Sequence, residues 1–119
     1  MLCSCDECSD INTLFSSLQQ LGKDLQSDQN LNLIVDFFST LGNRERLIIM
    51  TVLKDKDRCV CELEAILDKS QPSISHHLRE LEKLNLIRGW KKGKFTYYSL
   101  LKDNLNKYLP QIKRNLWVE

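Results

Sequence analysis

Five cysteines draw attention in this chain of 119 residues because they fall into two clusters. Cys3, Cys5 and Cys8 lie near the N-terminus, and Cys59 and Cys61 lie together in the middle of the chain. Cysteine thiolates bind soft ions such as cadmium, lead, zinc, arsenite and antimonite. A single cysteine is commonly just a small core residue, but two clusters favour ion binding or thiol chemistry. The first cluster has three thiols, one fewer than a closed structural zinc site needs.

The spacing of Cys59 and Cys61 limits how the two thiols can act together. Inside a regular helix, side chains two residues apart point about 200° apart and could not share one ion. At a helix start this limit relaxes, and Cys59 can occupy the N-cap with Glu62 three residues later, as in a capping box. Both thiols then lie at the positive end of the helix dipole, which favours thiolate.

The two cysteines open a segment, residues 59–84, that is typical of a helix, a tight turn and a second helix. Apolar residues at helical spacing predict one buried face for each helix. Ser70 is suited to cap the second helix, and Pro72 is tolerated in its first turn. His77 falls on the inner face and is expected to be packed and hydrogen-bonded. The outer face carries Gln71, Ser73, Ser75, His76 and Arg79.

Such an outer face is either the solvated surface of a helical hairpin or a recognition helix for the major groove of DNA. The next segment favours DNA. Residues 86–90 and 95–100 are rich in aromatic and β-branched residues and predict a β-hairpin, with Lys91, Lys92 and Lys94 at its turn. A lysine-tipped hairpin after a recognition helix is the wing of a winged helix-turn-helix. The predicted fold is therefore mainly α with a small β-hairpin.

The distribution of charge supports DNA binding, although the total is nearly balanced at 17 basic and 16 acidic residues. Residues 79–119 carry ten Lys or Arg against four Asp or Glu, whereas residues 1–30 carry one against five. Positive charge therefore gathers where phosphates would lie.

Several classes of protein are not expected. The N-terminus has no basic start followed by an apolar stretch, and no apolar run reaches membrane-spanning length. These features predict a cytoplasmic protein with reduced cysteines and no membrane partner. No acid–base pair or cofactor fingerprint is visible, so we do not expect an enzyme.

The rest of the chain predicts helices over about residues 10–26, 31–41, 46–53 and 102–117. We expect one winged helix-turn-helix domain over residues 10–119, preceded by a cysteine-containing arm over residues 1–9. The first and last helices carry apolar stripes that such a core does not need. These stripes either pack on the domain itself or bind a second subunit.

Four motifs resemble, in their order, the ArsR/SmtB family of metal-responsive repressors. They are L-G-N-R-E-R-L-I-I-M, C-V-C-E-L, S-Q-P-S-I-S-H-H-L-R-E-L and K-K-G-K-F-T-Y-Y-S-L, within about residues 31–100. An ordered set is more specific than one pattern. The resemblance implies a repressor that binds operator DNA as a homodimer and is released by a thiophilic ion at Cys59 and Cys61. It also implies that the terminal helices form the dimer interface, through Leu14, Leu18, Leu105, Tyr108, Ile112 and Leu116.

The resemblance bears on the ion as well. The arsenic-sensing branch often has a third cysteine three residues after the second, where this chain has Glu64. The cadmium- and lead-sensing branch takes further thiolates from an N-terminal arm, and this chain has such an arm. Its cysteine layout is therefore most similar to the cadmium- and lead-sensing branch.

Two alternative functions remain open from the sequence. One is a redox-sensing repressor on the same fold, in which Cys59 or Cys61 forms a disulfide with the arm. The other is a protein–protein adaptor that does not bind DNA, a function that the wing lysines disfavour.

Overall fold

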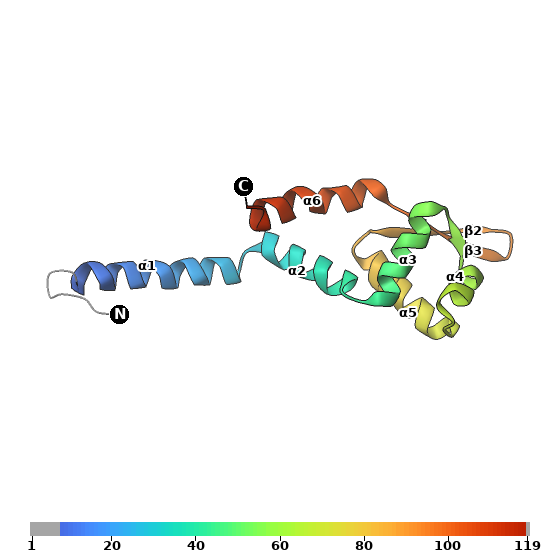
Figure 1. Cartoon of the computed structure of the whole chain (residues 1–119), viewed down its shortest axis with the longest axis horizontal. Coiled ribbons are helices and arrows are strands. Elements are labelled where there is room, and N and C mark those ends of the chain that lie inside the picture. The colour runs from blue at the N-terminus through green and yellow to red at the C-terminus, as the bar shows by residue number, and fades with distance from the viewer. Residues whose placement is uncertain (1–7, 119) are drawn as a thin grey trace. The chain divides into compact units, whose positions relative to one another are not determined.

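The computed structural model describes residues 8–118, with side chains described from Asp10 onward (Figure 1). The chain forms two compact units, Met1–Leu33 and Ile34–Glu119, and the boundary between them falls inside the second helix. The predicted fold class, mainly helical with a β-hairpin, is confirmed. None of the described helices is both long and apolar enough to cross a membrane.

The first unit consists of α1 (Cys8–Gln26) and the start of α2 (Gln29–Leu41). The Asp28 carboxylate accepts a 2.9 Å hydrogen bond from the Asn30 N–H, which helps to start α2. The apolar stripe predicted for α1 is present but uncovered, because its large side chains are more than two-fifths exposed. These side chains are Leu14, Phe15, Leu18, Leu21 and Leu25.

The second unit is built around α3 (Arg44–Asp55), α4 (Val60–Leu67) and α5 (Gln71–Lys83). Asn43 caps α3 by accepting a 3.2 Å hydrogen bond from the Arg46 N–H. Side chains from all three helices and from the segment after α5 form the core, and Ile49, Leu63, Ile74, Leu81 and Leu86 are fully buried. The helical spacing predicted the burial of Leu63, Ile74 and Leu81, because residues three and four apart share one helix face.

A tight turn joins α4 to α5, as the sequence predicted. Asp68 ends α4 in the left-handed conformation with φ of 52°, and its N–H bonds to the Glu64 carbonyl. Ser70 occupies the N-cap position of α5, and Pro72 lies in its first turn. Because proline needs no hydrogen bond there, the chain can reverse and start α5 within a few residues.

The sheet has three antiparallel strands, β1 (Arg58–Cys59), β2 (Ile87–Lys92) and β3 (Phe95–Leu100), in the order β1-β3-β2. The β2–β3 hairpin is the predicted wing, and Gly93 provides the positive φ of 62° that its turn requires. Strand β1 was not predicted, because two residues are too few to show a strand periodicity. In the structure Arg58 lies opposite Tyr98, and Cys59 lies opposite Tyr97.

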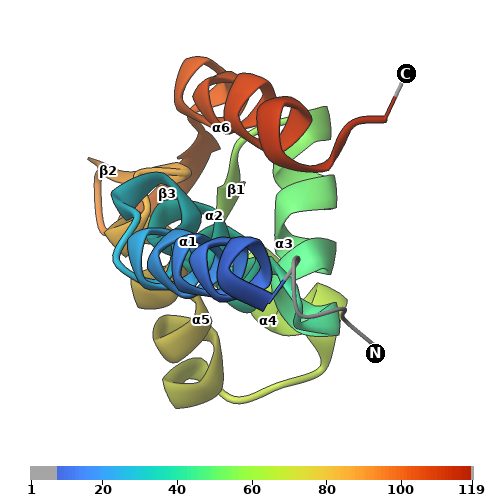
Figure 2. The same ribbon diagram turned by 90° about the vertical axis from the view of Figure 1, so that its left-hand side faces the viewer.

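The last helix, α6 (Lys102–Leu116), continues through Pro110. Figures 1 and 2 show α6 and α5 on opposite sides of the second unit. Tyr108 stacks on Phe37 with ring centroids 4.4 Å apart, and its hydroxyl donates to the Leu84 carbonyl at 3.3 Å. One side of α6 therefore packs on the core of its own domain.

A polar network joins the buried face of α5 to α3. Arg46 Nε donates to His77 Nδ1 at 3.1 Å, so the neutral ring carries its proton on Nε2. That Nε2 lies 2.6 Å from Glu45 Oε2, and Lys69 Nζ lies 3.6 Å from Glu45 Oε1. His77 is buried, which together with these hydrogen bonds confirms the prediction of a packed, hydrogen-bonded histidine.

We predict that Glu45→Gln will lower stability in a pH-dependent way. The hydrogen bond from His77, followed by Lys69, lowers the pKa of Glu45 from its ordinary 4.5. A lowered pKa means that the carboxylate stabilises the fold above that pH and loses this contribution as the pH falls through the folded-state value. Urea unfolding should show the variant weaker than the parent near pH 7, and the two should converge as the pH falls below the ordinary pKa of 4.5. A gap that stays constant over this range would contradict the prediction.

Candidate functional site

The outer face of α5 is positioned by the burial of its inner face. Ile74, His77, Leu78 and Leu81 are buried, and this fixes which residues point outward. Gln71, His76 and Arg79 are exposed, whereas Ser73 and Ser75 are half-buried. The polar face predicted to read DNA is therefore accessible, although its two serines are less exposed than its other three residues.

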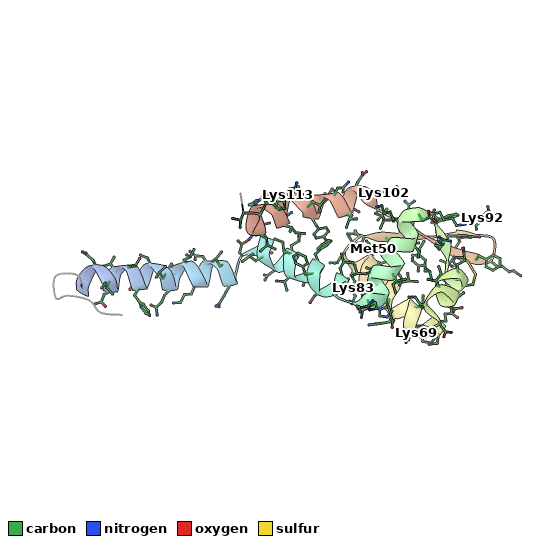
Figure 3. All side chains as sticks on the ribbon, in the orientation of Figure 1. Met50, Lys69, Lys83, Lys92, Lys102 and Lys113 are labelled. Atoms are coloured by element: carbon green, nitrogen blue, oxygen red, sulfur yellow. A yellow bond between two sulfur atoms is a disulfide. The ribbon has the colours of Figure 1, made fainter. Side chains whose placement is uncertain are left out.

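The wing presents the three predicted lysines, Lys91, Lys92 and Lys94, all of which are exposed. Figure 3 shows Lys92 on the β2–β3 hairpin. At the base of the wing, Trp90 stacks on Tyr97 with ring centroids 4.9 Å apart. Trp90 Nε1 also donates to Ser99 Oγ at 2.8 Å. Packing of the wing base thus holds the lysine-bearing turn in place.

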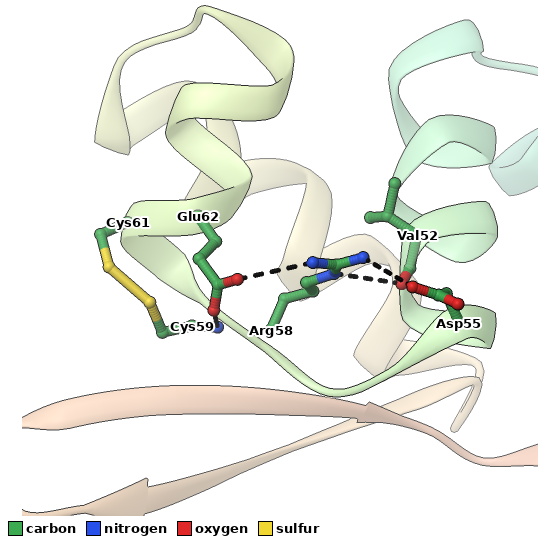
Figure 4. Close-up of polar contacts among 6 residues, drawn as sticks. All are labelled: Val52, Asp55, Arg58, Cys59, Cys61 and Glu62. Carbon is green, nitrogen blue, oxygen red and sulfur yellow. Dashed lines mark hydrogen bonds and ion pairs between the residues drawn. A yellow bond between two sulfur atoms is a disulfide. The ribbon is translucent and has the colours of Figure 1, made fainter.

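Cys59 and Cys61 form a disulfide (Figure 4). Their Cα atoms are 5.4 Å apart, and the backbone of Cys59 is extended, with φ of −82° and ψ of 161°. This N-cap conformation directs the two side chains toward each other, which a regular helix would not allow. The relaxed geometry expected at the helix start is present, but the pair is oxidised, whereas the sequence led us to expect reduced thiols.

A chain of polar contacts links the backbone of Cys59 to the end of α3 (Figure 4). Glu62 Oε1 accepts the Cys59 N–H at 3.1 Å, as predicted for one half of a capping box. Arg58 reaches Glu62 at 3.5 Å, the Val52 carbonyl at 3.3 Å and Asp55 at 3.0 Å. The Cys59 N–H, and secondarily Arg58, lower the pKa of Glu62. These contacts tie the start of α4 to the end of α3.

The cysteine pair lines a pocket of about 230 Å³. Cys59 is buried and Cys61 is exposed, so the disulfide is accessible from one side. Residues of three elements complete the lining: Val60 and Glu64 from α4, Gln71 from α5, and Lys94, Phe95 and Thr96 from the wing. Phe95 and Thr96 were not predicted as site residues, since no sequence signal shows that the wing tip approaches the cysteines.

The structure allows a partial test of whether these residues suit a thiophilic ion. Two neighbouring sulfurs can serve as two ligands once the disulfide is reduced. The described side chains contain no group of three or more Cys, His, Asp or Glu that could hold an ion. Cys3, Cys5 and the side chain of Cys8, the predicted additional ligands, lie outside the part of the chain that the structure describes. The described pair therefore fits as an incomplete soft-ion site.

The residues expected at a dimer interface differ in their surroundings. Leu14, Leu18 and Leu116 are 55%, 53% and 62% exposed. Three others, Leu105, Tyr108 and Ile112, are partly buried against the core of their own domain. Leu109 and Trp117 were not predicted but are also exposed, at 48% and 67%. Of the predicted interface residues on α6, Leu116 is therefore exposed, and Leu105, Tyr108 and Ile112 pack on their own domain.

Several known proteins are similar to this chain in sequence. The family model described as "Bacterial regulatory protein, arsR family" matches residues 43–88. The arsenical resistance operon repressor of Bacillus subtilis is 36% identical over 75 residues, which cover 62% of this chain and 71% of that protein. The cadmium resistance transcriptional regulatory protein CadC of Listeria innocua is 41% identical over 63 residues, covering 52% of this chain and 53% of CadC.

A solved structure agrees with these relatives. The ArsR-like transcriptional regulator from Rhodococcus sp. RHA1 superposes with a TM-score of 0.65 at 26% identity, covering 73% of this chain and 82% of that one. The matched family segment runs from the cap of α3 into β2 and so contains α3, α4 and α5. The chain therefore belongs to the arsR family of bacterial regulatory proteins, and it is a DNA-binding transcriptional regulator rather than an enzyme.

Proposed function

We propose that this regulator is a homodimeric repressor that leaves its operator when a thiophilic ion binds at Cys59 and Cys61. The observation that carries the proposal is the shared pocket, in which the cysteine pair faces both the first residue of the recognition helix, Gln71, and the wing tip. An ion bound in this pocket would lie against residues of both α5 and the wing, and could therefore change the position of both. The relatives that are named for cadmium and arsenical resistance support an ion of this class.

The ion is a soft one, among cadmium, lead, zinc, arsenite and antimonite. Cys59 and Cys61 provide two sulfurs on a folded element, and Cys3, Cys5 and Cys8 are the source of further sulfurs. The ion must bind the DNA-free form more tightly than the DNA-bound form, and the coupling is reciprocal. We expect the protein to act in the cytoplasm, where its operator lies.

On the DNA side, α5 enters the major groove and the wing follows the backbone. Gln71, Ser73, Ser75 and His76 face base edges, and Arg79 faces a phosphate. Lys91, Lys92 and Lys94 contact the backbone or the minor groove. This assignment follows from which side chains remain outside once the inner face of α5 is buried.

A redox function on the same fold is the second candidate. The Cys59–Cys61 disulfide favours it, since the two thiols are close enough to be oxidised together. This pairing differs from the disulfide with the arm expected from the sequence. Oxidation would then replace the ion as the signal that changes the start of α4.

The first prediction from this proposed function concerns the wing. Lys92→Ala should weaken binding to all DNA sequences alike, because a backbone contact carries no sequence information. The slope of log K against log salt should become shallower by about 0.9, the value for one phosphate contact. Fluorescence anisotropy at several salt concentrations measures it. An unchanged slope would remove the wing from the interface.

The second prediction concerns the dimer. The parent should sediment as a dimer at micromolar concentration, and Leu14→Glu together with Leu18→Glu should shift it to monomer, because burying two unpaired carboxylates is costly. Ser16→Glu, which helical spacing places on the other side of α1, is the matched control and should stay dimeric. A monomeric parent in analytical ultracentrifugation would refute the dimer.

The third prediction concerns the thiols. In reduced protein, Cys59→Ser or Cys61→Ser should abolish ion-driven release and leave ion-free operator binding intact. Loss of Cys3, Cys5 or Cys8 alone should be milder, because a neighbouring thiol can substitute.

Operator release is titrated in turn with cadmium, lead, zinc and arsenite, and thiolate-to-metal charge-transfer absorbance is recorded alongside. A parallel titration uses an oxidant with no ion present. If Cys59→Ser and Cys61→Ser respond to ions as the parent does, the ion site lies elsewhere. If only the oxidant releases the parent, the redox function is correct.

A further inference from the structure

Trp90 lies on the face of the sheet that is turned away from the core. Tyr98 and Leu100 of β3 are partly buried against the core. Because side chains alternate along a strand, Tyr97 and Ser99 point to the opposite face. Trp90 pairs with Tyr97 across the hairpin and therefore shares that face. The position of Trp90 thus depends on the contacts made on this outer face.

On this face, two hydrogen bonds join Trp90 to the residue that precedes β1. Trp90 Nε1 donates to Ser99 Oγ at 2.8 Å, and Ser99 Oγ donates to Asp57 Oδ2 at 2.6 Å. The direction of both bonds is fixed, because an indole N–H only donates, an ionised carboxylate only accepts, and a hydroxyl does both. The bond to the carboxylate is charge-assisted, and such bonds are stronger than neutral ones. The Ser99 hydroxyl therefore links the indole to Asp57.

A second contact reaches Trp90 from the same segment. Cys59, two residues after Asp57, lies opposite Tyr97 in the sheet. The Tyr97 ring in turn stacks on Trp90 with an interplanar angle of 20°. Trp90 is followed directly in the chain by the lysines of the wing turn. A displacement of the segment that carries the cysteines would therefore reach Trp90, and the lysines beyond it, through both contacts.

We propose that Ser99 is a positioning residue, through which a change at Cys59 and Cys61 moves the wing. Binding of an ion changes the positions of the two sulfurs, and with them the backbone at Cys59 and the neighbouring Asp57. The Ser99 hydroxyl passes this displacement to Trp90. Ser99 is not among the residues that line the pocket, so it acts without touching the ion. This inference rests on the proposed function and adds to it one side chain that couples the thiols to the wing.

The first experiment uses the full-length, reduced protein with cadmium as the probe, and anisotropy gives the operator Kd with and without cadmium. Ser99→Ala should lower the ratio of these two Kd values about fivefold, the effect expected for one hydrogen bond. Ser99→Thr keeps a hydroxyl at this position and should keep the ratio of the parent. Cadmium affinity in the absence of DNA should be the same in all three proteins, because Ser99 lies outside the pocket.

Lys92→Gln is the matched control for a wing that binds DNA less well. It should weaken operator binding with and without cadmium alike, and so leave the ratio of the two Kd values as in the parent. If Ser99→Ala also keeps the ratio of the parent, Ser99 only supports the fold, and its positioning role is overturned.

A second measurement needs no DNA. The chain has two tryptophans, so Trp117→Phe leaves Trp90 as the only source of tryptophan fluorescence. Cadmium, and separately an oxidant, should shift the emission of Trp90 in this background, and Ser99→Ala should lose most of both shifts. A Trp90 emission that responds to neither reagent would overturn the positioning role. A Trp90 emission that responds, in a protein that cadmium does not release from the operator, would overturn the proposed function alone.

Discussion

The arrangement of this domain depends on the double role of Cys59, which ends β1 and also occupies the N-cap of α4. Its pairing with Tyr97 fixes the start of α4 against the wing. Its extended backbone in turn brings its sulfur to that of Cys61. Arg58 and Glu62 hold the same backbone through hydrogen bonds and ion pairs. Any chemistry at the two sulfurs therefore acts on a point where sheet and helix are joined.

From that point, two routes lead to the elements that we propose to contact DNA. One follows the chain through α4 and the tight turn at Asp68 to α5, whose inner face is buried and whose His77 is held by Glu45 and Arg46. The other crosses from β1 to β3 and reaches the wing, where Tyr97 stacks on Trp90. The pocket lies where both routes begin. A small ligand at the thiols is thus placed to influence helix and wing together.

The apolar surface is divided unevenly between the two units. In the second unit, Tyr108 and its neighbours on α6 are used internally, and Leu116 and Trp117 stay exposed. In the first unit, α1 exposes its whole apolar stripe. Helices in proteins gain most of their stability from packing such a face, whereas isolated helices are marginal. This is the physical reason for proposing a second subunit.

Local spacing was sufficient to predict α4, α5, the hairpin and the buried position of His77, because helix and strand periodicities are properties of neighbouring residues. It also identified Cys59 as an N-cap and the outer residues of α5. It could not reveal β1, since two residues show no periodicity and their partners lie near residue 97. Contacts between distant segments form the pocket and place Lys94 in its lining. They also pack Tyr108 on Phe37 of its own domain. Such contacts arise only when the whole domain packs, so they emerged from the folded arrangement.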